Sequence, residues 1–258
     1  MFVETDILNG LMEVRIWGTL GWHDIRQRYR RSVIGPFWFT LSTAIMVIVL
    51  GALYSQLLNQ KIDEYLPYLA VGLIVWQFIA SCIIEGASSL ISMAYLIKQI
   101  KLPFTIYVCR EVWRNFIILL HSIPVAMIAL VFFGHWPTMS FFLLPFGLLL
   151  LALNGVWIGV VLGILCARFR DISPIVANLT QVVFFLTPVM WSPDILKDRA
   201  WVVNFNPFHH LIEIVRAPMI GAPIYWQSWV WSISICVFGL FFAHFLMLRY
   251  RNRIAYWI

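Results

Sequence analysis

Candidate catalytic side chains in this sequence are few and isolated. His209 and His210 precede Glu213, and because residues four apart meet on one helix face, His209 and Glu213 could together bind a metal ion. Adjacent histidines point in different directions, which argues against such a site. No Gly-x-Ser-x-Gly or His-Glu-x-x-His motif occurs, and no lysine follows a glycine as a phosphate-binding loop requires. We therefore expect no catalytic residue, no metal and no cofactor on this chain, and no ATP hydrolysis by the chain alone.

The elements that position these side chains must lie in a membrane. Of the 258 residues, 62% are hydrophobic and 12% are charged, and the mean hydropathy is +0.86. Soluble domains are about 45–50% apolar and about 25% charged. The net charge of +6 is better explained by the basic cytoplasmic loops of a membrane protein than by a nucleic-acid partner, so we expect no nucleic acid.

Six apolar stretches have the length of membrane-spanning helices, which need about 20 residues. The sequence therefore predicts an all-α polytopic membrane protein, with residues 1–258 forming a single transmembrane domain. Fourteen of the 18 Lys and Arg residues lie in the N-terminal arm, in alternate connections and in the C-terminal tail, which places both termini in the cytoplasm. The six expected spans are residues 36–58, 66–91, 106–133, 139–166, 172–192 and 226–248.

Two segments outside the spans are amphipathic. Residues 1–35 carry apolar side chains at helical spacing among charged ones, which predicts an amphipathic helix in the cytoplasmic interface. A membrane-surface anchor and a docking site for a partner both fit this helix. Residues 193–225 contain two apolar pieces, 194–205 and 208–220, that are too short to span. We expect two short helices in the outer loop between spans five and six, which re-enter the membrane or dip into its interface.

Four charged residues lie near the cytoplasmic ends of the second and third spans. An isolated charge costs at least a few kcal/mol (about 2.5–3.5) in hydrocarbon, so we expect these residues to form ion pairs. A role in gating and simple snorkelling to the interface both remain open. The four residues are Glu85, Arg110, Glu111 and Arg114.

Gly155, Gly159 and Gly163 recur every four residues in the fourth span. Such a stripe on one helix face allows two helix backbones to approach closely. We expect this contact to lie within the helix bundle in preference to an interface between two copies of the chain.

Aromatic residues make up 16% of the chain, and a belt at the membrane interfaces is their ordinary explanation. Five of them fit a belt less easily: Phe37 and Trp38 open the first span, Phe184 and Phe185 lie within the fifth, and Trp191 lies at its outer end. Flat ring faces suit the C–H faces of sugars and hold them without strong directional bonds, so that a polymer could slide. A lipid-facing belt stays the alternative for each residue.

Two motifs carry a resemblance to a known family. The first runs Trp17-x-x-Leu20, His23-Asp24-Ile25-x-x-Arg28-Tyr29, Ser32-x-x-Gly35-x-x-Trp38, and the second runs Thr187-Pro188-Val189-x-Trp191, then Asn206-Pro207 and Glu213-Ile214-Val215-Arg216. With six spans and cytoplasmic termini, essentially the whole chain resembles type-2 ABC exporter permeases that move polysaccharides such as O-antigen and capsule. The second motif is similar to the family's outer-loop signature, whose residues here are Asn206, Pro207, Glu213 and Arg216.

The resemblance implies a homodimer in the bacterial inner membrane, with two copies of a separate ABC ATPase on its cytoplasmic face that bind ATP and Mg. In that family the amphipathic N-terminal helix and a short coupling helix between spans two and three contact the ATPase. Apolar residues of the coupling helix would fill a groove on the ATPase, and lysines would orient it. The coupling helix maps to residues 95–104, with Tyr95, Ile97, Lys98, Lys101 and Leu102 as the expected contacts.

The resemblance also implies a channel lined by spans one and five of both copies, with re-entrant helices at its outer mouth. The expected lining is the set of five aromatic residues named above, from Phe37 to Trp191. An anionic lipid headgroup could meet a group of arginines at the inner leaflet, although topology anchoring explains the same residues. These arginines are Arg26, Arg28, Arg30 and Arg31.

The function expected on these grounds is that of a non-catalytic permease subunit for ATP-driven export of a lipid-linked polysaccharide, O-antigen or a related surface glycan. A type-2 ABC permease for a drug, a teichoic acid or a small lipid is one alternative, because its architecture would be the same. An ion-coupled carrier is another, and the lack of acidic residues near the middle of the spans counts against it.

Overall fold

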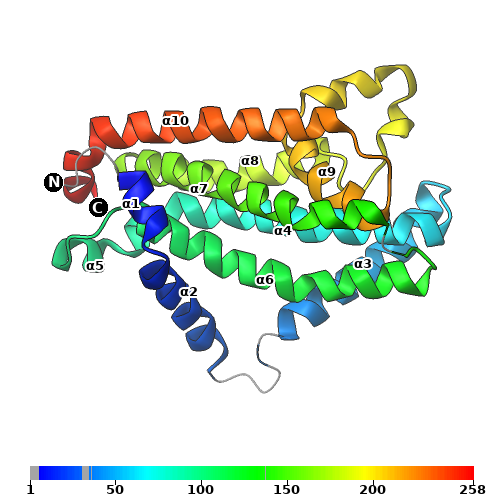
Figure 1. Ribbon diagram of the computed structural model, residues 1–258, viewed down its shortest axis with the longest axis horizontal. Helices are drawn as coiled ribbons and strands as arrows, with labels where there is room; N and C mark the ends of the chain where they lie inside the picture. The colour runs from blue at the N-terminus through cyan, green and yellow to red at the C-terminus, as the bar shows by residue number, and fades with distance from the viewer. Residues whose placement is uncertain (1–5, 31–34, 36, 137) are drawn as a thin grey trace.

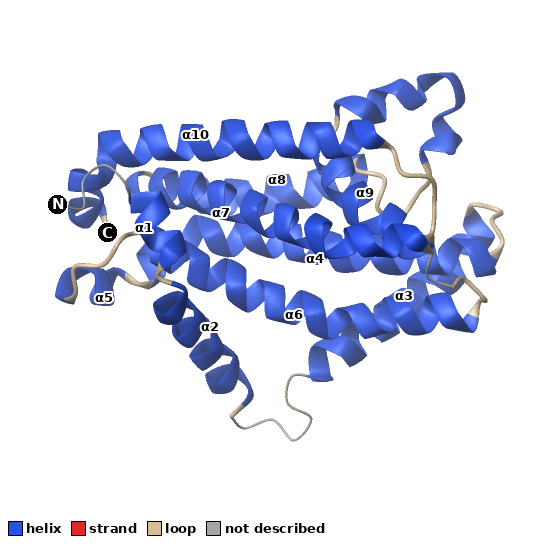
Figure 2. Ribbon diagram, viewed as in Figure 1, coloured by secondary structure: helices blue, strands red, loops and turns tan. Residues whose placement is uncertain are grey.

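The computed structural model of the protein describes residues 6–30, 35, 37–136 and 138–258. Every regular element within these ranges is helical (Figure 2), which confirms the all-α prediction. The elements are α1 (Asp6–Met12), α2 (Val14–Tyr29), α3 (Phe37–Leu57), α4 (Ile62–Ser92), α5 (Ala94–Gln99), α6 (Thr105–Phe132), η1 (Met139–Leu143), α7 (Leu144–Arg168), α8 (Ile172–Leu186), η2 (Pro193–Phe205), α9 (Pro207–Ile220) and α10 (Trp226–Trp257).

Five helical segments of the described ranges are long and apolar enough to cross a membrane, so the chain is a multi-pass membrane protein. They are α3, α4, α6, η1 together with α7, and α10. These helices run roughly along the long axis of the molecule (Figure 1). The centre is α4, which packs against α3, α6, α7, α8 and α9. By contrast, α3 has most of its apolar surface on the outside of the bundle.

The helix of the fifth expected span, residues 172–192, ends earlier than the sequence analysis proposed. α8 stops at Leu186 and has 15 residues, which give a length of about 22 Å against a hydrocarbon core of about 30 Å. Thr187 has extended backbone angles, because a residue before proline is driven away from the helical conformation. Pro188 therefore ends the helix, and Trp191 lies in the loop that follows it.

Two further boundaries differ from expectation. The described part of the N-terminal segment 1–35, residues 6–30 and 35, contains two helices in place of one, since Glu13 between α1 and α2 has non-helical backbone angles. The last span was expected over 226–248, but α10 continues to Trp257. Residues 249–257 contain neither glycine nor proline, so nothing in the sequence stops the helix where it becomes polar.

The C-terminus lies at one end of the bundle, beside α1 and α5 (Figure 1), and we call this the terminal end. η2 and the connections at 58–61 and 221–225 lie at the opposite, distal end. The buried carboxylate of Asp6 joins α1 to the start of α6, where it accepts hydrogen bonds of 3.1 Å from the amides of Phe104 and Thr105. The same carboxylate lies 3.5 Å from Arg251 Nε in α10. The terminal end is thus fixed by contacts among α1, α6 and α10.

The stripe Gly155, Gly159 and Gly163 of α7 lies against α4 inside the bundle. A Cβ atom added to Gly86 of α4 would come 2.7 Å from the Gly159 Cα, so the two backbones touch. Added Cβ atoms would meet Cys82 Sγ at 3.0 Å from Gly155, and Ser89 Oγ at 3.0 Å from Gly163. The contact between α4 and α7 therefore depends on residues without side chains.

Gly86→Ala is expected to destabilise the protein by about 1–3 kcal/mol, because the new methyl group meets backbone that cannot move independently. Thermal unfolding of the purified protein in detergent measures the effect. Gly18→Ala in α2 is the matched control, since an added Cβ there has no neighbour within 4 Å. That control should be neutral or slightly stabilising. Equal melting temperatures for Gly86→Ala and the wild type would contradict the close packing of α4 on α7.

Candidate functional site

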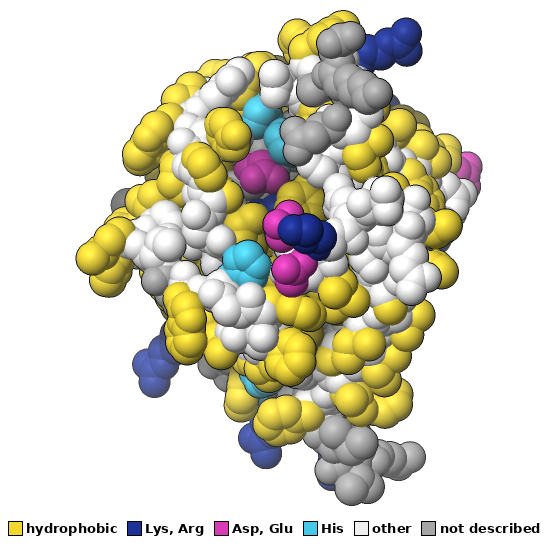
Figure 3. Space-filling view, turned by 90° about the vertical axis from the view of Figure 1, so that its right-hand side faces the viewer, with side chains coloured by type: hydrophobic (Ala, Val, Ile, Leu, Met, Phe, Trp, Pro, Cys, Tyr) yellow, Lys and Arg dark blue, Asp and Glu magenta, His cyan; other side chains and the backbone are white. Residues whose placement is uncertain are grey.

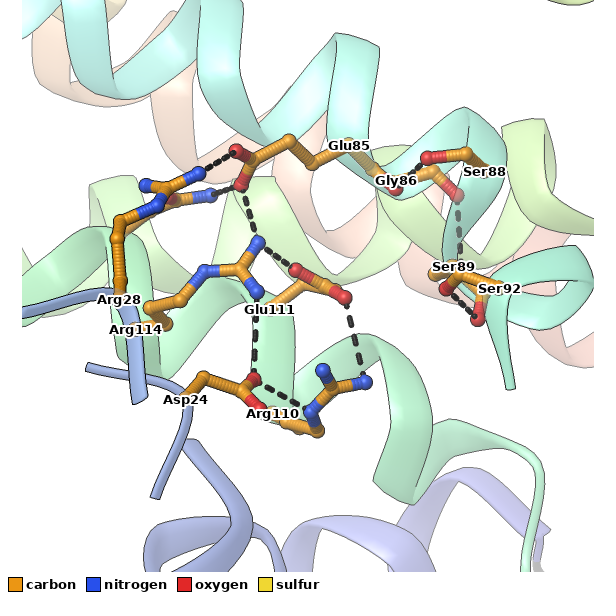
Figure 4. Close-up of polar contacts among 11 residues, drawn as sticks. Asp24, Arg28, Glu85, Gly86, Ser88, Ser89, Ser92, Arg110, Glu111 and Arg114 are labelled. Atoms are coloured by element: carbon orange, nitrogen blue, oxygen red, sulfur yellow. Dashed lines mark hydrogen bonds and ion pairs between the residues drawn. The ribbon is translucent and has the colours of Figure 1, made fainter. Parts of the chain in front are cut away.

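A cluster of charged side chains joins α2, α4 and α6 near the terminal end (Figure 4). Arg114 lies at its centre, with Nη2 2.6 Å from Glu85 Oε2 and Nη1 3.2 Å from Asp24 Oδ2. Arg114 also contacts Glu111. Arg110 Nε lies 2.6 Å from Asp24 Oδ2, and its Nη1 lies 3.4 Å from Glu111 Oε1. We call these five residues the charge cluster.

The charge cluster brings together the four charged residues that the sequence placed in the second and third spans. Asp24 of α2 is a further member that was not expected, because in the sequence it is part of a motif but has no visible partner. With Asp24 included, the cluster ties α2 to the bundle through two arginines, Arg110 and Arg114. Asn115 Nδ2 completes it with a hydrogen bond of 2.7 Å to Glu85 Oε2.

The arginines expected to meet a headgroup lie along the exposed side of α2 and beyond its end. Arg28 is 49% exposed, with Nη2 4.0 Å from Glu85 Oε1 at the edge of the charge cluster. Its guanidinium also lies 5.8 Å from the centre of the Phe39 ring. Arg26 and Arg30 are exposed, and Arg31 lies outside the described residues.

A groove of about 370 Å³ runs between α3 and α8, and α4 forms its floor. Its aromatic wall is Trp76 of α4 and Phe184 of α8, whose ring centres are 5.6 Å apart. Its polar lining is Thr43, Gln77, Thr180 and Gln181. We call it the α3–α8 groove.

The polar residues of the α3–α8 groove continue along α4 to the charge cluster. Gln77, Ser81 and Glu85 recur every four residues, so they occupy one face of the helix. They line a second cavity of about 140 Å³, to which Asn115 of α6 also contributes. Amide side chains within a membrane-spanning helix are costly against lipid and therefore indicate a surface that contacts protein or water. Sequence analysis missed Gln77 and Gln181, although the spacing along α4 was a signal that could have revealed the first.

The five aromatic residues expected in a channel lie at different places. Phe184 lines the α3–α8 groove, and Phe185 is exposed beside it. Phe37 is exposed at the start of α3 and lines an apolar cavity between α3 and α6, and the neighbouring Trp38 is also exposed. Trp191 lies in the loop after α8, where its Nε1 donates a hydrogen bond of 3.2 Å to the Phe185 carbonyl.

The residues expected to couple to an ATPase lie at the terminal end, in α5 and the segment after it. Tyr95 is 77% exposed, and Lys101 is also exposed. Ile97 and Leu102 are partly buried against the core of the bundle. Lys98 Nζ donates a hydrogen bond of 2.6 Å to the carbonyl of Ile258, so α5 touches the C-terminal residue.

At the distal end, the loop 187–191 is held by Arg216 of α9, whose side chain is 0% exposed. Both Nη1 and Nη2 donate hydrogen bonds of 3.0 Å to the Pro188 carbonyl. Nη1 also lies 3.0 Å from Glu213 Oε1, and the guanidinium carbon lies 3.9 Å from the centre of the Tyr68 ring. A buried arginine with these contacts fixes the loop to α4 and α9 at once.

The other signature residues reinforce this attachment. The Asn206 side chain caps α9, since its Oδ1 accepts hydrogen bonds from the amides of Phe208 and His209. Its Nδ2 donates a hydrogen bond of 3.0 Å to Thr187 Oγ1, and Pro207 begins the helix. The two segments of the second sequence motif, 187–191 and 206–216, thus contact each other directly.

Residues 16–220 match the ABC-2 type transporter family, and they include both sequence motifs. The chain belongs to the ABC-2 type transporter family. The match confirms the family expected from the motifs.

This ABC-2 transporter chain is similar to relatives named as permeases. The O-antigen export system permease protein RfbA of Klebsiella pneumoniae is 24% identical over 237 residues, which are 88% of this chain and 90% of the relative. The protein of the same name from Myxococcus xanthus is 25% identical over 197 residues, which are 75% of this chain and 76% of the relative. Both names describe the permease component of an O-antigen export system.

Two adjacent histidines of α9, His209 and His210, lie near the distal end of this ABC-2 transporter chain. Burial lowers the pKa of His209 to about 3, and the neighbouring His210 and Arg216 contribute to the shift. Burial also lowers the pKa of His210, and it raises the pKa of Glu213 although Arg216 opposes that shift. His209 Nδ1 lies 4.0 Å from Glu213 Oε1. In the part of the chain that the structure describes, no three His, Cys, Asp or Glu side chains group as metal ligands.

Proposed function

We propose that this chain is the permease subunit of an ATP-driven exporter of lipid-linked polysaccharide, O-antigen or a related glycan, in the bacterial inner membrane. The observation that carries the proposal is the α3–α8 groove, in which aromatic rings and amide side chains lie together. A sugar chain needs both, because its C–H faces pack on rings and its hydroxyls exchange hydrogen bonds with amides. The names of the relatives support the same substrate class.

The transporter is a homodimer in this proposal, with α3 and α8 of two copies facing each other. An open groove with Gln77 and Gln181 would be unfavourable against lipid, and a second copy would convert it into a closed path. α8 then forms a sixth, short crossing, and α9 with η2 re-enters at the outer mouth. Both termini lie in the cytoplasm, as the distribution of Lys and Arg favours.

The energy comes from two copies of an ABC ATPase that bind ATP and Mg and dock at the terminal end. The exposed Tyr95 and Lys101 offer a contact for that partner. Closure of the ATPases would move α5 and α2 as rigid bodies, and the charge cluster would carry this movement into α4 and α6. Arg26, Arg28 and Arg30 would meet the anionic lipid headgroup at the inner leaflet.

The double variant Gln181→Leu with Phe184→Ala tests this function. We expect loss of most surface glycan and its accumulation inside the cell, because the path loses a ring and an amide. Cell-surface and cytoplasmic glycan are measured in a strain that depends on this permease. Val182→Ala is the control, since Val182 is exposed on α8 and does not line the groove.

Three outcomes would contradict the proposal. Normal glycan export by the double variant would show that the glycan does not pass through the α3–α8 groove. Loss of efflux of a drug or a small lipid, with the glycan unaffected, would favour the alternative ABC cargo. Transport that continues after the ATPase is disabled would favour an ion-coupled carrier.

Tyr95→Ala is expected to reduce export severalfold by weakening ATPase docking, while the melting temperature of the permease stays unchanged. Exposed aromatic side chains contribute strongly to protein interfaces but little to the stability of the free subunit. Tyr256→Ala is the matched control, because Tyr256 is 88% exposed at the same end of the molecule. Copurification of the ATPase with each variant, together with export, measures the effect. Equal recovery of the ATPase with Tyr95→Ala and with Tyr256→Ala would contradict docking through α5.

A further inference from the structure

A further polar cavity, of about 560 Å³, opens at the distal end and shares no lining residue with the α3–α8 groove. Its walls come from η2, α9, the start of α10 and Tyr68 of α4. Figure 3 shows histidine and acidic side chains in a hollow near the middle of this face. The volume lies in the range of about 300–1,000 Å³ that is typical of small-molecule sites. We call this space the distal cavity.

Side chains with free hydrogen-bonding atoms line the distal cavity. His209 Nδ1 is buried and has no hydrogen-bond partner in the described chain. Glu213 uses Oε1 to bind Arg216, which leaves Oε2 as an acceptor. Gln227 adds an amide that can both donate and accept. Because a buried polar atom without a hydrogen-bond partner is destabilising, this cavity favours a ligand that supplies hydroxyl groups.

The described side chains that line the distal cavity carry little net charge, and this property selects among ligands. Glu213 is paired with Arg216, whose Nη1 lies 3.0 Å from Glu213 Oε1. His209 and His210 are neutral at neutral pH because burial lowers the pKa of both. An anionic ligand would therefore find no unpaired cation among these side chains. A ligand with an ammonium group would likewise find no unpaired carboxylate among them. A neutral ligand fits best.

Aromatic rings supply the remaining surface of the distal cavity. Tyr68, Trp201 and Tyr225 all line it. Trp201 packs edge-on against Phe205, with ring centres 6.0 Å apart. A ligand that is neutral, rich in hydroxyls and apolar on one face is a carbohydrate ring.

We propose that the distal cavity binds one neutral pyranose unit of a glycan. The inference rests on the proposed function, because the glycan would reach this cavity only after crossing the membrane. A bound unit at the outer end would oppose backward sliding of the polymer between cycles of ATP hydrolysis. The distal cavity thus acts on the polymer separately from the α3–α8 groove.

Saturation-transfer-difference NMR on the full-length permease in lipid nanodiscs tests the subsite. The probes are the methyl glycosides of glucose, galactose, mannose, rhamnose and N-acetylglucosamine. We expect at least one glycoside to bind with millimolar affinity. Gln227→Leu should weaken it about three- to tenfold, as expected for one lost hydrogen bond. Trp201→Ala should weaken it comparably, and Trp136→Ala, an exposed tryptophan outside the distal cavity, should leave it unchanged.

Thermal unfolding of each variant verifies that it is folded, and a glycan export assay separates the subsite from the proposed function. The absence of binding by every glycoside, or equal binding by the wild type, Gln227→Leu and Trp201→Ala, would overturn the subsite. Glycan export without such binding would contradict the subsite alone. Specific glycoside binding by a permease that cells do not need for glycan export would contradict the proposed function alone.

Discussion

Arg216→Met is expected to lower the stability of the permease by about 3–5 kcal/mol and to abolish transport. The variant leaves the buried carboxylate of Glu213 without its partner, and such an uncompensated charge is among the most costly single changes in a protein. It also removes both hydrogen bonds to the Pro188 carbonyl, which fix the end of α8. A drop in melting temperature of roughly 10 °C follows for a chain of this size.

The double variant Arg216→Met with Glu213→Gln separates the two contributions. Glu213→Gln removes the stranded charge, so the double variant should recover part of the lost melting temperature but not transport, because the loop 187–191 stays unattached. Arg216→Lys should be intermediate, since an ammonium group cannot make the forked contact with one carbonyl. A melting temperature for Arg216→Met within about 2 °C of the wild type would show that the Arg216 contacts do not stabilise the distal end.

Arg114→Met is expected to be nearly as damaging, with a loss of about 3–5 kcal/mol. Arg114 contacts Asp24, Glu85 and Glu111, so its removal leaves acidic side chains of α2, α4 and α6 in excess. Thermal unfolding measures the loss of stability. The ratio of ATP hydrolysed to glycan exported measures whether α2 has become uncoupled from the bundle.

Arg28→Gln is the matched control for stability, because it removes a positive charge from the edge of the same cluster. Its contact with Glu85 is at 4.0 Å and half exposed, and such pairs contribute at most about 1 kcal/mol. If Arg114→Met and Arg28→Gln lowered the melting temperature equally, the charge cluster would not stabilise the attachment of α2 to the bundle.

The sequence predicted the helices well, because the length and composition of an apolar stretch determine whether it suits a bilayer. α3, α4 and α6 begin and end within a few residues of the expected spans. The early end of α8 was also foreseeable, since Pro188 was visible and the rule for the residue before proline is general. The extension of α10 was harder to foresee, because its last residues leave the apolar pattern without any helix-stopping residue.

The candidate site was less predictable, because it depends on contacts between distant segments. Arg216 and Pro188 are 28 residues apart, and neither residue type indicates the other as its partner. Asp24 is 90 residues from Arg114, so a sequence pattern could not pair them. Gln77 stood in an apolar stretch, and only the positions of α3 and α8 identify it as part of a groove.

The shortness of α8 has a consequence for the surrounding lipid. A helix of 15 residues is about 8 Å shorter than the hydrocarbon core of a bilayer. Such a mismatch is relieved when the bilayer thins locally or when the polar residues that flank the helix reach toward the membrane surface. If α8 crosses beside the polymer, the lipid barrier is thinnest where the polymer must pass. Membrane thickness then contributes to the energetics of translocation, in addition to the chemistry of the protein.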